Sequence, residues 1–530
     1  MHTRYYNIRE MLEGSAVKYS LKTAFKIKTD KGYRCVTYRE LKEEADALAS
    51  FLVKNGYNKK RVAVIGENSY GWILAFLAVL SAGGIIVPLD RGLLEHELDE
   101  QLSRAEAELV FCSSTFYENL KERTGCRAIQ INSEEFNGII EGGKTADKTE
   151  YLSIDIDSSK MSILLFTSGT TAKSKAVMLS QNNILSNVYG LSLWEKFEED
   201  DISMALLPFH HAFGMVQTVL FLSLGICNVF CEGLRVAKCL TEYGVTVFVA
   251  VPLIVDEIKN TIFRKLRKEN KLGLINMLNS FAGVLNKMHI DIRRKMFSQI
   301  IDKLGGGLRL IIVGAAAANP DTLNWLNNIG VLTIQGYGLS ETSPVVSAEN
   351  ESNMKLGSVG KALPGIDVKI VNPDEKGLGE IAVRGENVML GYYGDEAATE
   401  AVMDGEYFLT GDIGRLDKDG YIFITGRKKN VIVLHTGKNV FPEEIEALLD
   451  QCDAIKECVV YNSQKGGRDC ISAKIVYDIN LEREDAENQI VEHINKVNRM
   501  LIDYKQIKEW DITDVEMEKT TTKKIKRANI

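Results

Sequence analysis

The stretch GWILAFLAVLSAGGIIVPL, residues 71–89, contains no charged residue. Its length is close to the roughly 20 apolar residues that span a bilayer as a helix. However, Gly83, Gly84 and Pro88 interrupt the run, and the β-branched residues after the two glycines are typical of a strand. We therefore predict a buried helix, a glycine turn and a buried strand here, with a membrane span as the alternative.

The sequence around this stretch repeats the alternation of helix and strand. Thr37 and Glu40 have the spacing of a capping box, so a helix is expected to begin there and to end near Gly56, before the apolar run RVAVIG. Further short apolar runs are separated by helical stretches: ELVFC, SILLF, VTVFVAV, LRLIIVG and VLTIQGYG. This alternation predicts an α/β protein with largely parallel sheets.

The final third of the chain has a different texture. From about residue 356, short alternating strands with Gly and Asp turns predict a small antiparallel β-rich unit, over about 356–425. A second change comes at the basic run 426–429, after which a compact tail of βαβ-like pattern continues to residue 530. We therefore predict an N-terminal domain over 1–426 and a C-terminal domain over 427–530.

Composition narrows the class of protein. The chain has 530 residues, of which 45% are hydrophobic and 26% charged, as in ordinary globular proteins. Its net charge of -8 argues against nucleic acid as the main partner. Nine cysteines without a C-x-x-C pair predict reduced thiols in the cytoplasm rather than a disulfide frame or a zinc site. The first residues contain no apolar signal segment, so we expect a cytoplasmic protein.

The run LLFTSGTTAKSKAVMLSQ, residues 164–181, begins as a buried strand and continues into hydroxyl and glycine residues with two lysines. Such a loop presents hydroxyl and backbone N–H donors without bulky side chains, and it suits a polyphosphate. It lacks the G-x-x-x-x-G-K-[ST] pattern of a Walker A loop. The run alone predicts either a phosphate loop or a polar surface turn.

Five further motifs follow this loop in order: LPFHHAFGM at 207–215, QGYGLSETSP at 335–344, YFLTGD at 407–412, GYIFITGRKKNVIVLHTGKNVFPEEIE at 420–446, and EKTTTKKIKR at 518–527. In this order and spacing they resemble the core motifs of the adenylate-forming superfamily, which contains acyl-CoA synthetases, peptide-synthetase adenylation domains and luciferases. The resemblance covers essentially the whole chain. It implies two α/β subdomains and a small β-barrel-like subdomain, followed by a small mobile C-terminal α+β domain.

The resemblance implies that ATP activates a carboxylic acid as an acyl-adenylate. A carboxylate that attacks the α-phosphate must overcome repulsion between anions, so the site needs cations and donors. Glu341 matches the acidic ligand of Mg²⁺, and Thr342 matches the residue that hydrogen-bonds the α-phosphate. Tyr337 matches the residue that packs on adenine, and Asp412 and Arg427 match the pair that holds the ribose. The other nucleotide-binding positions are implied to be Thr167, Ser168, Gly169, Thr170, Thr171, Lys175, Gly336 and Gly338.

The resemblance also implies two arrangements of the C-terminal domain. In the first, Lys524 reaches the attacking carboxylate and the α-phosphate, while His211 gates the carboxylate pocket. The domain then swings about a hinge that matches Lys429. In the second arrangement, the loop with Gly437 and Lys438 faces the adenylate, and the acyl group passes to CoA.

Two motifs depart from the family pattern. Ala172 and Ala176 stand where the family usually has glycine in the phosphate loop, and Lys523 replaces the usual glycine before the C-terminal lysine. If position 172 needs a positive φ, an alanine there costs roughly 1 to 2 kcal/mol. These departures place the affinity for ATP in question.

The substrate class follows from residues 251–320 and from the C-terminal motifs LHTGKNVFPEEIE and TTTKKIKR, which look most like those of long-chain fatty acyl-CoA synthetases. Small apolar residues are expected to line the acid pocket, without an acidic residue to pair with an ammonium group. The expected substrate is a medium- to long-chain fatty acid, and the expected acceptor is CoA. A ligase that loads an acyl carrier protein and a non-catalytic nucleotide-binding pseudoenzyme are the alternatives. The expected pocket residues are Val313, Gly314, Ala315, Ala316 and Gly338.

Residues 256–303 contain eleven Lys or Arg against five Asp or Glu, in a chain whose net charge is -8. A basic amphipathic helix pair here is expected to touch a membrane surface or an acidic partner. The expected apolar positions are Ile258, Ile262, Leu266, Phe281 and Leu285. The alternative is a solvated helical face over a core.

Overall fold

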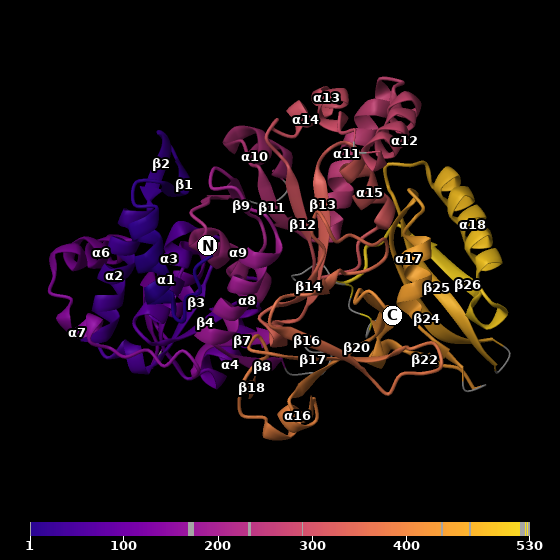
Figure 1. Ribbon diagram of the computed structural model, residues 1–530. Helices are drawn as coiled ribbons and strands as arrows, with labels where there is room; N and C mark the ends of the chain where they lie inside the picture. Colours follow the sequence, from indigo (N-terminus) through magenta and orange to yellow (C-terminus); the bar gives the residue numbers. More distant parts are fainter. Residues whose placement is uncertain are drawn as a thin grey trace.

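The computed structural model describes residues 2–530 except 124, 168–173, 232–234, 289, 436–437, 466–467, 520–524, 526 and 528–530. Two large sheets with their helices form the N-terminal body, and a smaller antiparallel sheet leads from it to a separate C-terminal unit (Figure 1). This arrangement confirms the predicted α/β class, with a large N-terminal part and a smaller C-terminal one.

The first sheet contains the run that decides the fold. Residues 71–89 form α3 (Tyr70–Ser81), a turn at Gly83 with a φ of 76°, and β4 (Ile85–Leu89), and every residue of α3 is buried. The predicted helix, turn and strand are therefore confirmed. The centre of this seven-stranded sheet is parallel, and its order is β18 (Gly391–Tyr392), β8 (Lys175–Ser180), β7 (Met161–Thr167), β4, β3 (Arg61–Ile65), β5 (Ala107–Cys112) and β6 (Arg127–Gln130).

The second sheet has nine strands, and its six central strands are parallel. The antiparallel strand β14 follows β13 directly, so the chain reverses where the parallel part of the sheet ends. The order is β15 (Lys361–Ala362), β14 (Val345–Ala348), β13 (Leu332–Gly338), β12 (Leu310–Val313), β11 (Val247–Ala250), β9 (Ile202–Ala205), β10 (Cys227–Phe230), β1 (Thr23–Thr29) and β2 (Gly32–Thr37).

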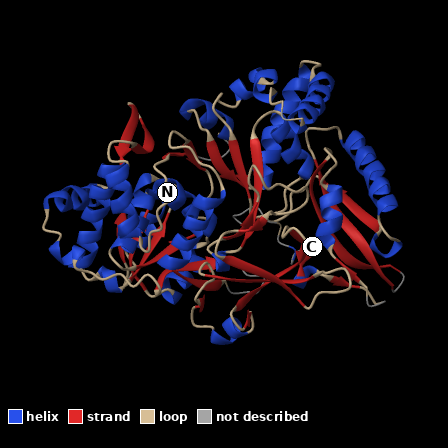
Figure 2. Cartoon of the chain, viewed as in Figure 1, coloured by secondary structure: helices blue, strands red, loops and turns tan. Residues whose placement is uncertain are grey.

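Helices join and cover the two sheets (Figure 2). One large core runs from sheet to sheet through α3, α8 and α9. The capping box of Thr37 and Glu40 opens α2 as predicted. None of the helices in the described part of the chain is both long and apolar enough to cross a membrane. The other helices of the body are α1 (Ile8–Lys18), α2 (Tyr38–Lys54), α4 (Glu95–Arg104), α5 (Ser114–Leu120), α6 (Glu134–Thr145), α7 (Thr149–Leu152), α8 (Gln181–Trp194), α9 (Ala212–Ser223), α10 (Val236–Tyr243), α11 (Pro252–Lys268), α12 (Leu272–Lys287), α13 (Arg293–Met296), α14 (Ser298–Lys303), α15 (Pro320–Asn328) and α16 (Glu396–Glu400).

The β-rich segment expected over 356–425 contributes to three sheets rather than one. Strand β15 pairs with β14 in the nine-stranded sheet, and β18 pairs with β8 in the seven-stranded sheet. Strand pairing over such distances in sequence is decided by tertiary packing and not by local pattern. The rest forms an antiparallel sheet of β16 (Ile366–Val371), β17 (Gly379–Gly385), β20 (Tyr407–Leu416) and β19 (Met403–Asp404), with β21 (Ile422–Arg427) on β20.

The C-terminal unit has its own core and touches the body near α11 and α15. The guanidinium of Arg267 pairs with Asp453 at 2.9 Å, and the amide of Asn319 donates to the carbonyl of Asp450 at 3.3 Å. The unit contains the hairpin β22 (Ile432–Val433) and β23 (Asn439–Val440), α17 (Pro442–Leu449), α18 (Arg483–Met500), and a sheet of β24 (Ile455–Lys465), β25 (Arg468–Tyr477) and β26 (Ile507–Thr513).

Candidate active site

Tyr392 brings two of the predicted site residues together. Its hydroxyl donates to Oε1 of Glu341 at 3.0 Å, and the ammonium of Lys175 lies 4.2 Å from the centre of its ring. Burial and the neighbouring Glu341 carboxylate raise the pKa of the Tyr392 hydroxyl well above its ordinary value. Sequence analysis did not single out Tyr392, because only the pairing of β18 with β8 places it beside Lys175.

The two ends of the predicted phosphate loop meet at the edge of this cluster. Thr167 and Lys175 are directly opposite on β7 and β8, and the Thr167 hydroxyl donates to the Lys175 carbonyl at 3.3 Å. Four predicted loop residues, Ser168, Gly169, Thr170 and Thr171, lie outside the described residues, as does Ala172. Ala176 is buried in β8 and is not among the described residues with a positive φ, so this strand accommodates alanine.

A second cluster joins Tyr337, Asp412 and Arg427. The Tyr337 hydroxyl donates to Oδ2 of Asp412 at 2.7 Å, and Nε of Arg427 lies 2.7 Å from Oδ1 of Asp412. Asp412 and Arg427 are opposite each other on β20 and β21, and the Asp412 side chain is 6% exposed. Burial, followed by the Asp412 carboxylate, raises the pKa of Tyr337 well above its ordinary value. The predicted ribose pair is therefore brought together, although its role toward ribose remains a prediction.

One short segment links the two clusters, because Tyr337 and Glu341 are four residues apart. Four residues of extended chain span at most ~14 Å, so the two clusters are close enough for one nucleotide to contact both. Gly338 within the segment cannot be a larger residue, because a Cβ there would lie 1.7 Å from the carbonyl oxygen of Pro344. At Gly336 a Cβ would be 3.5 Å from the nearest atom, so only Gly338 is required by packing.

Thr342 lies at the end of this segment and is fully buried. Its hydroxyl lies 3.0 Å from the carbonyl of Leu339 and 2.9 Å from that of Pro344, within hydrogen-bond reach of both. Its predicted contact with the α-phosphate would require the hydroxyl to leave these partners.

His211 occupies the N-cap position of α9, without a side-chain capping hydrogen bond, next to the buried His210. The two imidazole rings lie 4.1 Å apart, and Nε2 of His210 is 3.4 Å from Oδ1 of Asp90. This places His211 between β9 and α9, in the body of the protein. Its gating role remains a prediction.

Phe213, two residues further along, packs against the predicted acid pocket. A Cβ on Gly314 would lie 2.8 Å from the Phe213 ring, so the ring rests on the glycine backbone at the end of β12. Leu191 and Trp194 of α8 pack in the same apolar cluster, with Val345. Of the other predicted pocket residues, Val313 is buried, Ala315 and Ala316 are exposed, and Ala315 has a φ of 72°.

Of the predicted residues from Lys429 onward, Lys429 follows Arg427 by two positions, whereas Lys438 lies within the C-terminal unit. Burial, followed by the neighbouring Arg427 charge, lowers the pKa of Lys429, which therefore lies close to the ribose pair. Lys438 lies in the loop between β22 and β23, with its ammonium 4.5 Å from the Tyr504 ring centre. Gly437, Lys523 and Lys524 lie outside the described residues. In the described part of the tail, Arg527 pairs with Glu446 and donates to the carbonyl of Val460 at 3.2 Å.

The donor set near Glu341 fits Mg²⁺ held together with phosphate oxygens. Mg²⁺ is usually bound by one or two carboxylates plus substrate phosphates rather than by a protein cage. Glu341 offers a carboxylate fixed by Tyr392, and the described residues contain no cluster of three or more His, Cys, Asp or Glu that could form such a cage.

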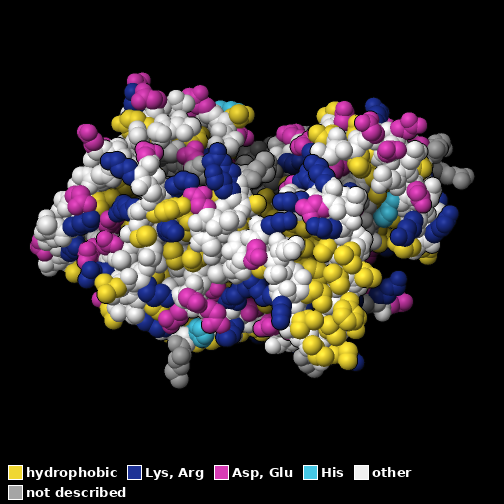
Figure 3. Space-filling view, turned by 90° about the horizontal axis from the view of Figure 1, so that it is seen from above, with side chains coloured by type: hydrophobic (Ala, Val, Ile, Leu, Met, Phe, Trp, Pro, Cys, Tyr) yellow, Lys and Arg dark blue, Asp and Glu magenta, His cyan; other side chains and the backbone are white. Residues whose placement is uncertain are grey.

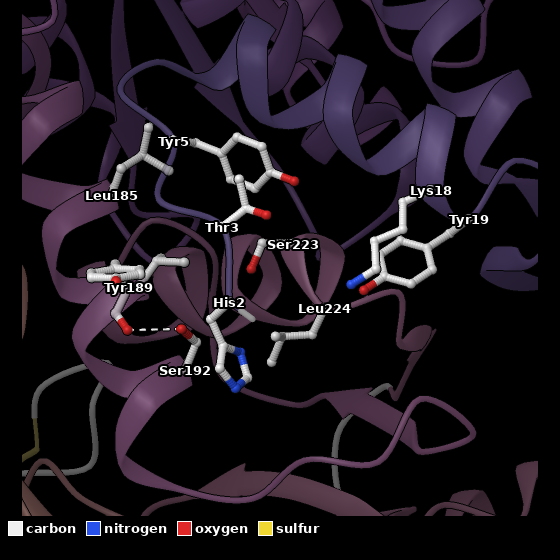
Figure 4. A pocket seen from close by; sticks show the side chains of 11 residues that line it. His2, Thr3, Tyr5, Lys18, Tyr19, Leu185, Tyr189, Ser192, Ser223 and Leu224 are labelled. Carbon is white, nitrogen blue, oxygen red and sulfur yellow. Dashed lines mark hydrogen bonds between the residues drawn. The ribbon is translucent and has the colours of Figure 1, made fainter.

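Two cavities lie outside both clusters. One, of about 20 Å³, has room for about one water and lies beneath the N-terminal segment, where Ser192 of α8 donates to the Tyr189 carbonyl (Figure 4). The other, of about 150 Å³, lies between α8 and the loop 363–366. None of the residues that line either cavity belongs to the Tyr392 or Asp412 cluster, so neither is the predicted nucleotide site.

Comparison with known proteins assigns the chain to a family. The sequence profile of the AMP-binding enzymes matches residues 12–393, and that of the AMP-binding enzyme C-terminal domain matches residues 429–530. The long-chain-fatty-acid–CoA ligase FadD15 of Mycobacterium bovis is 27% identical over 460 residues, which cover 81% of this chain and 76% of that protein. Fatty acyl-CoA synthetase B of Dictyostelium discoideum is 26% identical over 525 residues, which cover 89% and 76%.

Solved structures share the fold over almost the whole chain. The crystal structure of ATP-bound MatB from Rhodopseudomonas palustris has a TM-score of 0.79 at 24% identity, and the match covers 99% of this chain and 98% of that one. The O-succinylbenzoate coenzyme A synthetase MenE from Bacillus subtilis, in complex with AMP, has a TM-score of 0.76 at 22% identity and coverage of 98% and 97%. At these identities the likeness concerns the fold.

Proposed function

The chain belongs to the AMP-binding enzyme family, and we propose that within it the protein activates a medium- to long-chain fatty acid with ATP and transfers the acyl group to CoA. The observation that carries this proposal is the pair of clusters at the two ends of residues 337–341. At one end, Lys175 and Glu341 contact Tyr392, and Lys175 begins the strand that follows the predicted phosphate loop; at the other, Asp412 and Arg427 are opposite each other.

In the first half-reaction, a carboxylate oxygen of the acid bonds to the α-phosphorus while the bond to the bridging oxygen breaks, and pyrophosphate leaves. Lys175 and the loop 168–171 would hold the phosphates and offset the charge that accumulates on their oxygens. Glu341 would hold Mg²⁺, which neutralises charge on the phosphates when bound. Asp412 and Arg427 would fix the ribose, so that the α-phosphate is kept in line with the acid.

In the second half-reaction, the thiol of CoA bonds to the carbonyl carbon and AMP leaves. The C-terminal unit would turn about Lys429 so that the loop at Gly437 and Lys438 replaces Lys524 at the site. The position of Lys429 supports a hinge there, since it follows the predicted ribose residue Arg427 by two positions and lies just before β22, the first strand of the C-terminal unit.

Two observations support a fatty acid as the acid. The relatives named above include a long-chain-fatty-acid–CoA ligase and a fatty acyl-CoA synthetase. The described side chain next to Gly314 is apolar, because Phe213 packs on it, and Phe213 belongs to an apolar cluster with Leu191, Trp194 and Val345. Apolar pocket walls favour binding of an aliphatic chain, whereas a charged or strongly polar acid would lose its hydration there.

The test is ATP–pyrophosphate exchange with the purified full chain over straight-chain acids of graded length, followed by acyl transfer to free CoA or to a holo acyl carrier protein. We expect exchange that increases with chain length and an acyl-CoA product. If exchange occurs but the acyl group is transferred only to the carrier protein, then the carrier protein and not CoA is the acceptor. ATP binding without exchange for any acid would identify a non-catalytic nucleotide-binding protein and overturn the proposal.

A further inference from the structure

The outer face of α12 is an apolar stripe that no described part of the chain covers. Five side chains along it are between 53% and 63% exposed, and they recur three and four residues apart, which places them on one side of a helix. Figure 3 shows this region as a broad apolar patch on the upper surface of the molecule. The residues of the stripe are Leu274, Met277, Phe281, Val284 and Met288, and Ile290 and Ile292 extend it beyond the helix.

The inner face of α12 is firmly attached to the body. Ala282 is fully buried in the second core, and Leu278 packs against the same core. The amide of the buried Asn279 donates to the Trp325 carbonyl of α15 at 2.9 Å. The stripe is therefore held outward by a fixed helix, and a monomeric soluble protein rarely leaves such a contiguous apolar patch open unless something binds it.

This face differs from the one expected from sequence. Ile258 and Leu266 of α11 are buried in the second core, and Ile262 packs against it, so α11 contributes charge but little apolar surface. Phe281 is on the stripe, whereas Leu285 is only partly exposed. The expected amphipathic surface is thus carried by α12 alone.

The segment that carries the stripe has an excess of positive charge. Helix α12 contains no Asp or Glu, and residues 256–303 carry eleven Lys or Arg against five acidic residues. Lys265, Lys268 and Lys295 are exposed and form no ion pair with any residue in the described ranges, whereas Arg264 and Lys271 are paired. Lys and Arg side chains border the apolar patch in Figure 3.

We propose that the α12 stripe, flanked by Lys265, Lys268 and Lys295, docks the protein on an anionic lipid bilayer. An apolar helical face with basic residues beside it lies in the headgroup region, where the apolar side chains enter the acyl boundary and the lysines meet lipid phosphates. A second copy of this chain is a poorer partner, because a symmetric contact would bring two positive segments together. This inference concerns binding and does not depend on the acid that the enzyme activates.

The test is sedimentation of the full chain with vesicles of phosphatidylcholine alone or with added phosphatidylglycerol, at low and high salt, without ATP or acid. We expect binding to the anionic vesicles that weakens with salt. Met277→Ser with Phe281→Ser should reduce it at least tenfold, and the triple charge reversal Lys265→Glu, Lys268→Glu, Lys295→Glu should remove the preference for anionic lipid. None of these residues lies in either site cluster, so ATP–pyrophosphate exchange should be unchanged.

The matched control is Leu356→Ser, which removes an apolar side chain that is 79% exposed but lies outside residues 256–303. It should bind vesicles as the wild type does. Equal recovery with neutral and anionic vesicles, or full binding by the Met277 and Phe281 variant, would overturn the proposal. A second outcome would also overturn it: the wild type forms a concentration-dependent dimer and does not sediment with vesicles, and the Met277 and Phe281 variant no longer dimerises. A second copy of the chain would then cover the stripe.

Discussion

The segment 337–341 and the outer face of α12 are opposite in which kind of side chain each buries and exposes. In and beside the segment, Tyr337 and Asp412 are buried and Glu341 is half-buried, and each of the three side chains already has a partner. On α12, apolar side chains are exposed, and nothing in the described chain covers them. Burying a charge requires partners, so the first region must be assembled by folding itself. Exposed apolar side chains destabilise the folded state little, so the outer face of α12 can stay uncovered until a partner binds it.

The largest contrast should be seen in stability. Phe248 on β11 is fully buried in the second core, and Phe281 on α12 is 53% exposed. We expect Phe248→Ala to lower the free energy of unfolding by about 3–5 kcal/mol, since it leaves a cavity. Phe281→Ala should change it by no more than about 0.5 kcal/mol. Urea denaturation of both variants measures this. Equal losses would mean that the outer face of α12 is covered within the chain.

The next largest effect should belong to Lys524, which sequence alone assigns. Lys524→Ala should slow acyl-adenylate formation by about a hundredfold or more, as expected when one preorganised electrostatic contact is lost. When synthetic acyl-adenylate and CoA are supplied, acyl-CoA should still appear at near the wild-type rate, because that half-reaction uses the other arrangement of the domain. Loss of both halves in a folded variant, or of neither, would remove Lys524 from this role.

Asp412 tests the buried cluster directly. Asp412→Asn keeps the shape of the side chain but removes the charge that Arg427 and the Tyr337 hydroxyl engage. We expect the ATP concentration required for half-maximal exchange to rise about 5- to 150-fold, for a loss of roughly 1–3 kcal/mol. Titration calorimetry with ATP and a melting curve separate lost binding from lost folding. Normal ATP affinity in the folded variant would refute the ribose assignment.

Tyr392 should give a smaller loss. Tyr392→Phe keeps the ring beside Lys175 and removes only the hydroxyl that Glu341 accepts. Losing this one hydrogen bond should lower the exchange rate by roughly tenfold, and raising the Mg²⁺ concentration should recover part of the loss if Glu341 becomes less well positioned. An exchange rate equal to that of the wild type at every Mg²⁺ concentration would show that Tyr392 does not position Glu341.

The smallest effect concerns Glu349, a buried carboxylate that lies outside both the site clusters and the α12 stripe. Glu349, at the end of β14, accepts from the backbone N–H groups of Gln335 and Lys355 at 3.1 Å each, and it has no ion pair within the described chain. Burial raises its pKa to about 7. The folded protein therefore retains a proton there that the unfolded chain releases at lower pH, and this stabilisation is lost as the pH rises toward and above 7.

Glu349→Gln should remove this dependence. Relative to the wild type, the variant should be more stable at pH 8 than at pH 6 by about 1 kcal/mol, which melting curves at the two pH values can measure. Asp374→Asn is a suitable control, because the Asp374 side chain is exposed and only accepts from backbone N–H groups of its own surface turn, such as that of Lys376. A constant difference between Glu349→Gln and the wild type across pH would show that Glu349 titrates as an ordinary surface carboxylate.

Much of the fold is predictable from local sequence. The glycines after residue 82 stop α3, the capping box opens α2, and the short apolar runs become the parallel strands, since these signals act over a few residues. The motif residues Asp412 and Arg427 are also brought together as the resemblance implied, because they lie on neighbouring strands of one antiparallel pair.

Tertiary structure alone decided the rest. Tyr392 reaches Glu341 only because β18 pairs with β8 across more than 200 residues, and no local pattern encodes that pairing. Likewise, an apolar stripe at helical spacing predicts a helix with a face to bury, but it does not say which face meets the core. The sequence determined that α12 is an amphipathic helix, and packing against α15 decided that its stripe faces outward, because burial depends on the neighbours that the fold supplies.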